Sequence, residues 1–184
     1  MLGIGALILI AGQVWRPGES VPTTWPSATG SAVADEEAPP EEVTFGDAEE
    51  FTVSVPNGWQ VEDSSGTSVL ISRDGTSLFA RSYLAGEDAV ASDEARRMAT
   101  RYASGVKRTG KASTTAEDGP GGLARGSYHS AGTVDGRQVQ VYADVLIRPE
   151  DTQAVAVVTI LRGDADADVA QQLAAMRDEV LGQL

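Results

Sequence analysis

Apolar and polar residues alternate along several short segments of the chain, and the first clear example is residues 51–55. Every second residue of this segment is apolar, which is typical of a β-strand with one buried face. Pro56, Asn57 and Gly58 follow directly, and these residue types favour a turn. The pattern predicts a half-buried strand that ends in a turn and places Trp59 just beyond it.

Two Asp-Gly pairs each lie between two runs of β-forming residues. They divide residues 68–84, at Asp74-Gly75, and residues 132–147, at Asp135-Gly136. Aspartate and glycine both suit the left-handed backbone of a two-residue turn. The sequence therefore predicts two β-hairpins.

The outgoing strand of the second hairpin and the segment after it have different patterns. The outgoing strand alternates Val139, Val141, Ala143, Val145 and Ile147 with Gln138, Gln140, Tyr142 and Asp144. One face of this strand should therefore be core and the other mostly polar. Residues 153–161 are apolar on both faces, which indicates a central strand that is covered on both sides.

Two further segments carry apolar residues at helical spacing after an acidic start. The first starts at residues 92–94 and has Ala95, Met98, Ala99, Tyr102 and Val106 on one face; the last segment has Val169, Leu173, Met176 and Val180. Ser92 and Asp93 offer a cap for the first helix, which we expect to end near residues 107–110. Residues 84–91 and 114–122 are expected to be loops.

Together these elements predict an α+β domain. Its mostly antiparallel sheet of about six strands should be covered by helices on both faces. The stretch FTVSVPNGW, the early hairpin, the midway helix, the second hairpin with its following strand and the last helix resemble the Mog1/PsbP-like fold, an α/β/α sandwich with lipoprotein relatives in actinobacterial envelopes. The resemblance covers residues 43–184 and implies a binding or assembly protein, because members of that fold are mostly such proteins and share no catalytic residues.

The chain before this domain changes composition in two steps. Residues 2–15 carry no charge, and as a helix they reach about 21 Å, against a hydrocarbon core of about 30 Å. Residues 16–42 are rich in Pro, Ser, Thr, Gly and acidic residues, a composition typical of flexible linkers.

We therefore predict three parts. Residues 1–15 form an apolar helical membrane anchor whose basic flank lies upstream of Met1, residues 16–42 form a disordered acidic linker, and residues 43–184 form one globular domain. This organisation predicts a single-pass protein of the cell membrane with its C-terminal domain extracytoplasmic. A buried helix of a soluble protein is the alternative for the apolar segment, although it lacks the polar stripe that such helices usually carry.

Composition excludes several classes of function. The chain has 14 Lys and Arg against 27 Asp and Glu, and a net charge of -13, which argues against a nucleic-acid partner because that affinity comes from clustered cations. Without cysteine there is no disulfide framework, thiolate metal site or cysteine nucleophile.

Trp59 is the only tryptophan of the predicted domain. In a functional interpretation its ring is a recognition platform; in a structural one it caps one end of the sheet against a helix. Large aromatic rings bury much apolar area. We favour the structural interpretation.

Asp164, Asp166 and Asp168 alternate like the carboxylates of a calcium loop. The glycine and the distal glutamate of an EF-hand loop are missing, so helix capping explains them better. Residues 119–126 are rich in glycine but lack the ending of a phosphate-binding loop, and we expect a hairpin-like loop there.

His129 is the only histidine and stands near Ser127 and Ser130. A base beside one of these serines would suit a hydrolase, but no nucleophile-elbow pattern surrounds either serine. We therefore predict no catalytic, cofactor-binding or metal-binding residues, and we expect a membrane-tethered module that binds a protein or an envelope component. The alternatives are a small hydrolase using His129 with carboxylates and a weak divalent-ion binder through Asp164, Asp166 and Asp168.

Overall fold

The computed structural model describes residues 39–184. The predicted anchor and nearly all of the predicted linker lie outside these residues. Within the described residues, no helix combines the length and the apolar character needed to cross a bilayer. The first described strand begins at Glu41, two residues before the predicted start of the domain.

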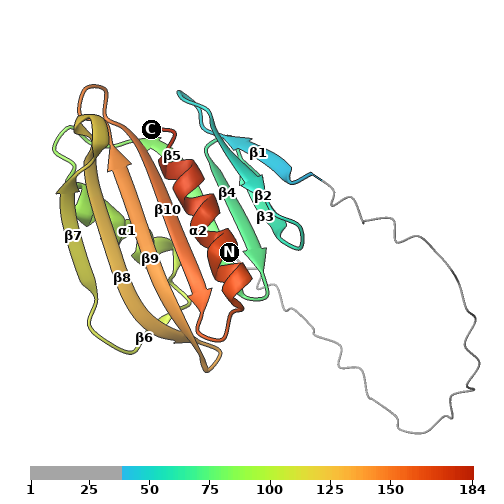
Figure 1. The fold of residues 1–184 in the computed structure, drawn as a ribbon. Helices are drawn as coiled ribbons and strands as arrows, with labels where there is room; N and C mark the ends of the chain where they lie inside the picture. The colour runs from blue at the N-terminus through green and yellow to red at the C-terminus, as the bar shows by residue number, and fades with distance from the viewer. Residues whose placement is uncertain (1–38) are drawn as a thin grey trace, which may run out of the picture. The chain divides into compact units, whose positions relative to one another are not determined.

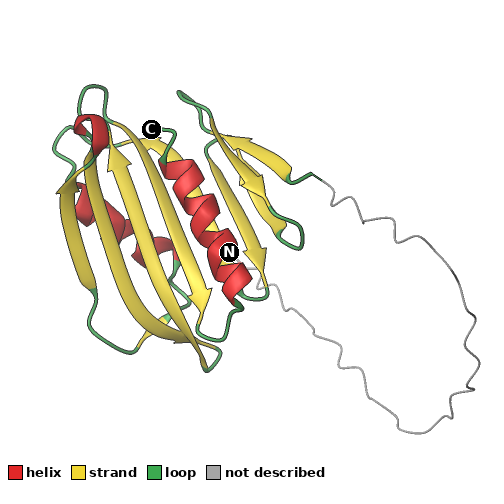
Figure 2. Cartoon of the chain, in the orientation of Figure 1, coloured by secondary structure: helices red, strands yellow, loops and turns green. Residues whose placement is uncertain are grey.

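The strands of the described chain form two antiparallel sheets (Figures 1 and 2). A two-stranded ribbon pairs β1, Glu41–Phe45, with β2, Phe51–Val55. The larger sheet has the order β3-β4-β5-β10-β9-β8-β6, with β7 also paired to β8. Its strands are β3 (Gln60–Ser65), β4 (Ser68–Arg73), β5 (Thr76–Leu84), β6 (Lys107–Arg108), β7 (Ser113–Asp118), β8 (Ala124–Val134), β9 (Arg137–Ile147) and β10 (Gln153–Arg162).

Two α-helices lie on opposite faces of the larger sheet. Helix α1, Ala91–Tyr102, lies behind β8 and β9 in Figure 1, and α2, Ala167–Leu181, lies in front of β10. A short 3-10 turn, Pro120–Gly122, joins β7 to β8. The predicted mostly antiparallel α+β domain with helices on both faces is therefore confirmed for the described residues.

Strand β10 separates two hydrophobic cores. Val155 and Val157 point into the core beneath α2, while Ala154, Ala156 and Val158 point into the core beneath α1. This placement confirms the prediction that residues 153–161 form a central strand, since β10 lies between β5 and β9. The β1-β2 ribbon adds its buried residues to the core beneath α2.

Both Asp-Gly pairs form the predicted hairpin turns. Asp74 and Asp135 have positive φ angles of 51° and 50°, and the glycine after each has a φ angle of 78°. These turns join β4 to β5 and β8 to β9, and both pairs of strands are antiparallel.

Several predicted boundaries were wrong. Helix α1 ends at Tyr102 rather than near residues 107–110, because Lys107 and Arg108 pair with β8 as strand β6. The N-cap of α1 is Val90, so Ser92 and Asp93 lie in its first turn and make no cap. Most of the expected loop at residues 114–122 is strand β7.

The strand count also differs from the prediction. About six strands were expected, and the described chain has ten. The four added strands are β1, β3, β6 and β7, and the last three consist almost entirely of exposed residues. Edge strands of this kind bury little on either face, so they lack the alternation that reveals a strand in a sequence.

Two glycines of β8 allow the α1 segment to approach the sheet closely. A Cβ atom at Gly126 would collide with the backbone of Ala91 at the start of α1. A Cβ atom at Gly132 would collide with the Val106 side chain and lie 2.9 Å from the carbonyl oxygen of Lys107. Glycine at these two positions therefore fixes both ends of the α1 segment against β8.

Each helix covers only part of its face of the sheet. Helix α2 packs on β10, β5 and β2, whereas α1 packs on β7, β8, β9 and β10. On the α2 side, β7 and β8 extend beyond the helix, as Figure 1 shows. On the α1 side, β3, β4 and β5 lie beyond the helix. The sheet therefore has one uncovered area on each face, and these two areas are the candidate functional surfaces.

Candidate functional site

The uncovered area on the α1 side carries aromatic and aliphatic residues, and we call it the aromatic face. It consists of Leu70 from β4, Phe79, Arg81 and Tyr83 from β5, Ile160 from β10 and Tyr102 from the last turn of α1. All six are half-buried, whereas the residues of β5 that alternate with them on the α2 side are buried. An aromatic-rich surface left uncovered in this way is characteristic of binding sites.

A hollow of about 210 Å³ opens in the aromatic face. Its floor is apolar, formed by Leu70, Phe79, Val158 and Ile160. The ring of Tyr102 stacks on Phe79, with 3.6 Å between the ring centroids. Strands β4, β5 and β10 hold the floor at fixed register, so the hollow is part of the rigid sheet.

Polar groups surround this apolar floor. Asp63 and Ser77 also line the hollow, and Asp63 is exposed. Arg81 donates a hydrogen bond from Nη1 to the Tyr102 hydroxyl at 3.1 Å. Among the described residues, the buried Nε atom of Arg81 has no hydrogen-bond partner. An apolar floor with a polar rim is the usual anatomy of a protein-binding surface.

The far end of the aromatic face is tied to α1. The Tyr83 hydroxyl donates a hydrogen bond to Oε2 of Glu94 at 3.2 Å, and the same carboxylate pairs with Arg97. Burial, and secondarily the charge of Glu94, raise the pKa of Tyr83 far above its ordinary value. Tyr83 therefore stays neutral at physiological pH.

The second uncovered area, on the α2 side of β8 and β9, holds His129. An Nε2 hydrogen bond joins His129 to Oε1 of Gln140 at 2.8 Å. The ring stacks on Tyr142, with 4.6 Å between the centroids. His129 is thus occupied by contacts across the β8-β9 pair.

The serines near His129 are not arranged for nucleophilic attack. The Ser127 hydroxyl donates a 2.6 Å hydrogen bond to Oδ1 of Asp144, which also lies 3.4 Å from Nη2 of Arg125. Ser130 is buried against the α1 core, on the opposite face of β8 from His129. The residues named for the hydrolase alternative are therefore not brought together as a catalytic dyad.

The three aspartates of the divalent-ion alternative have separate roles. Asp164 accepts a 2.8 Å hydrogen bond from Nε of Arg162, which lowers the pKa of Asp164. The helix capping expected from the sequence was wrong in part: Asp166 is the N-cap residue of α2 but makes no side-chain cap, and only Asp168 lies in the first turn. Among residues 39–184, no three His, Cys, Asp or Glu side chains are grouped so as to hold a metal.

Trp59 has the structural role that we favoured from the sequence. Its side chain is 7% exposed, and it packs in the core with Leu173 and Met176 of α2. The indole Nε1 donates a 2.7 Å hydrogen bond to Oε1 of Gln172. The ring therefore closes one part of the sheet against a helix, as expected.

Sequence reasoning missed the aromatic face. The sequence pattern placed Phe79 and Tyr83 on the same face of one strand. The pattern did not indicate which face of the sheet would remain uncovered by a helix. Tyr102 was assigned to the inward face of a helix that was expected to continue for another turn. The early end of that helix at Tyr102 is what leaves β4 and β5 uncovered.

No family model and no curated protein matches the chain. Among the solved structures that are similar to it are the following three. A mutant of protein Mog1 is 11% identical with a TM-score of 0.48 and covers 78% of this chain and 94% of its own. The Ran-binding protein Mog1p of Saccharomyces cerevisiae is 13% identical with a TM-score of 0.45, and 72% of this chain and 87% of that chain are covered.

The third similar structure is LpqN of Mycobacterium tuberculosis, described as involved in cell envelope biogenesis. It is 14% identical with a TM-score of 0.39, covering 78% of this chain and 88% of its own. Two of the three are Mog1 structures, the fold that the sequence resembles. The likenesses concern the arrangement of elements and do not indicate which residues bind.

Proposed function

We propose that this chain is a non-catalytic binding or assembly module that holds a protein partner on its aromatic face. The observation that carries the proposal is the hollow of about 210 Å³ in the uncovered part of the sheet. Aromatic residues and arginine, the types present here, are enriched among the residues that dominate binding energy at interfaces.

The shape of the hollow favours an apolar anchor residue in the partner. Leu70, Val158 and Ile160 offer only aliphatic atoms on the floor, so a buried polar group would lose its hydration without compensation. A single aliphatic or aromatic side chain fits a cavity of this size. Asp63 at the rim favours a positively charged residue beside that anchor.

The tether and the location of the domain are also part of the proposal. The uncharged residues 2–15 and the linker-like composition of residues 16–42 support a membrane anchor followed by a spacer. A domain held in this way at the extracytoplasmic membrane face meets partners at a raised local concentration. A partner in the membrane or envelope is therefore favoured over a freely diffusing one.

Site-specific crosslinking in intact cells tests the proposed surface. A photoreactive amino acid replaces Asp63, which is exposed and lines the hollow. The matched control carries the same amino acid at Thr115, an exposed residue of edge strand β7. The same envelope protein should be captured repeatedly from position 63, and it should be absent from position 115.

A second variant separates binding in the hollow from simple proximity. Ser77→Phe fills the hollow from a half-buried position of β5 and removes no side chain from either core. This change should abolish capture from position 63. Equal capture from positions 63 and 115, or capture that survives Ser77→Phe, would show that the aromatic face is not the binding surface.

A further inference from the structure

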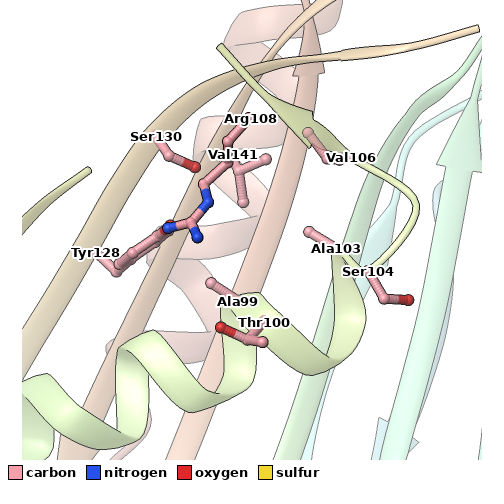
Figure 3. A pocket seen from close by; sticks show the side chains of 9 residues that line it. All are labelled: Ala99, Thr100, Ala103, Ser104, Val106, Arg108, Tyr128, Ser130 and Val141. Atoms are coloured by element: carbon pink, nitrogen blue, oxygen red, sulfur yellow. The ribbon is translucent and has the colours of Figure 1, made fainter. Parts of the chain in front are cut away.

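A second, polar pocket lies on the other flank of α1, away from the aromatic face. It has a volume of about 180 Å³ and lies between the end of α1, the segment leading into β6, and strands β8 and β9 (Figure 3). Arg108 reaches into it from β6, and the Nη1 atom of Arg108 lies 3.4 Å from the Tyr128 hydroxyl. The apolar walls are Ala99, Ala103, Val106 and Val141.

Ser130 adds a second hydroxyl to this pocket. The residue is 2% exposed and lines the pocket beside Tyr128. In the part of the chain that the structure describes, no group of the fold bonds to the Ser130 hydroxyl. Figure 3 shows Ser130 and Tyr128 on the same side of the pocket as the Arg108 guanidinium. One cation and two hydroxyls therefore face a common space.

Backbone geometry holds Arg108 in place. Arg108 pairs with Gly132 of β8, so its side chain follows the face of β8 that carries Ser130 and Tyr128. Gly132 lacks a Cβ atom, which lets Val106 lie directly over the sheet and close one wall of the pocket. The strand pair therefore fixes the backbone position from which Arg108 reaches the pocket.

The pocket also lies in a stretch of the described chain where the cations lack carboxylate partners. Arg101, Lys107, Arg108 and Lys111 are all exposed, and none forms an ion pair with a described residue. Most arginines elsewhere in the described domain form an ion pair with a carboxylate. They are Arg73, Arg96, Arg97, Arg125, Arg148, Arg162 and Arg177. In a chain with a net charge of -13, unpaired cations close in sequence to Arg108 favour an anion at this pocket.

We propose that this pocket binds the carboxylate of a small, partly apolar ligand. The carboxylate lies against the Arg108 guanidinium, which matches its planar shape, and accepts hydrogen bonds from the hydroxyls of Ser130 and Tyr128. The aliphatic part of the ligand packs on Ala103, Val106 and Val141. The surrounding cations attract the anion, and the proposal is independent of the protein-binding role of the aromatic face.

The test is an NMR titration of the isotopically labelled full chain at constant ionic strength. Sodium butyrate is the probe, butyramide is its uncharged control, and inorganic phosphate is the competing anion. Butyrate should give saturable shifts of the amides around Ser130 and Gly132. Butyramide should give none, and phosphate should bind more weakly than butyrate.

Two variants locate the charge that binds. Arg108→Gln should weaken butyrate binding by about tenfold or more, as expected for loss of a charge-assisted hydrogen bond. Lys111→Gln removes an equal charge from outside the pocket and should change the dissociation constant less than about twofold. Ser130→Ala should weaken binding while leaving the spectrum otherwise folded.

Three results would overturn the proposal. Shifts by butyramide equal to those by butyrate would show an apolar site without charge recognition. Tighter binding of phosphate would show a different anion specificity. Equal losses of butyrate affinity in Arg108→Gln and Lys111→Gln would show a diffuse effect of charge without a defined site.

Discussion

The indole of Trp59 donates a 2.7 Å hydrogen bond to Gln172, and this bond joins the turn after β2 to the outer part of helix α2. Gln172 also accepts a 3.2 Å hydrogen bond from Nη1 of Arg73, at the end of β4. One glutamine oxygen therefore accepts hydrogen bonds from the turn after β2 and from strand β4. Trp59, which stands out in the sequence, therefore packs and hydrogen-bonds the sheet to helix α2.

Trp59→Ala should lower the free energy of unfolding by about 3–5 kcal/mol, because it leaves a cavity in the core beneath α2. Trp59→Phe should cost less, since it keeps an aromatic ring and removes only the indole donor. Chemical denaturation of both variants measures the difference. An unchanged midpoint in Trp59→Ala would mean that the ring is exposed and free to act in recognition.

Gly126→Ala should be strongly destabilising for its size. The added Cβ atom meets the backbone of Ala91, which cannot yield without moving the start of α1. We expect a loss of about 1–3 kcal/mol, the usual range for overpacking. Gly105→Ala is the matched control, because a Cβ atom there has no neighbour within 4 Å. Similar melting temperatures of the two variants would contradict the close packing of α1 on β8.

Because of Tyr83, the free energy of unfolding of the domain should vary with pH in the alkaline range. The pKa of Tyr83 is raised in the folded domain, so above pH about 10 the unfolded chain loses this proton while the folded chain keeps it. The free energy of unfolding should therefore fall as pH rises above about 10, by up to about 1.4 kcal/mol per pH unit from this group.

Tyr83→Phe should remove that part of the pH dependence. Tyr142→Phe is the control, as Tyr142 is a half-buried tyrosine on the other side of the sheet. Denaturation curves recorded between neutral and alkaline pH give the slopes. Identical slopes for the wild type and Tyr83→Phe would show that Tyr83 ionises as readily in the folded chain as in the unfolded one.

Protease treatment of intact cells tests the predicted topology. If residues 1–15 anchor the chain with its domain extracytoplasmic, protease should cut the linker and release a stable fragment that starts near Glu41. The tightly paired strands of the domain should resist cleavage longer than the linker. A protein that stays fully protected in intact cells and soluble after lysis would refute the membrane tether.

Local patterns predicted the hairpins and the central strand correctly. Asp74-Gly75 and Asp135-Gly136 specify their turns through backbone conformation alone. Residues 153–161 reveal a strand with two buried faces because both faces are apolar. These features depend on neighbouring residues, so a single sequence suffices to recognise them.

The remaining features depend on contacts between distant residues. The pairing of β5 with β10 joins Leu84 to Gln153, and no local pattern indicates it. Helix α1 ends early because Lys107 and Arg108 find partners in β8, which overrides the helical spacing of Val106. Both proposed binding sites follow from this early end, and therefore neither was visible in the sequence.

The central claim is that a protein partner binds in the hollow of the aromatic face, and its most direct test uses the partner captured from position 63. The dissociation constant of the purified partner is measured for the wild-type chain, Ser77→Phe and His129→Ala. Ser77→Phe should weaken binding by at least about thirtyfold, the equivalent of about 2 kcal/mol for a central anchor. His129→Ala should leave it unchanged. Equal affinity of Ser77→Phe and the wild type, or substrate turnover by the chain that His129→Ala abolishes, would contradict the account.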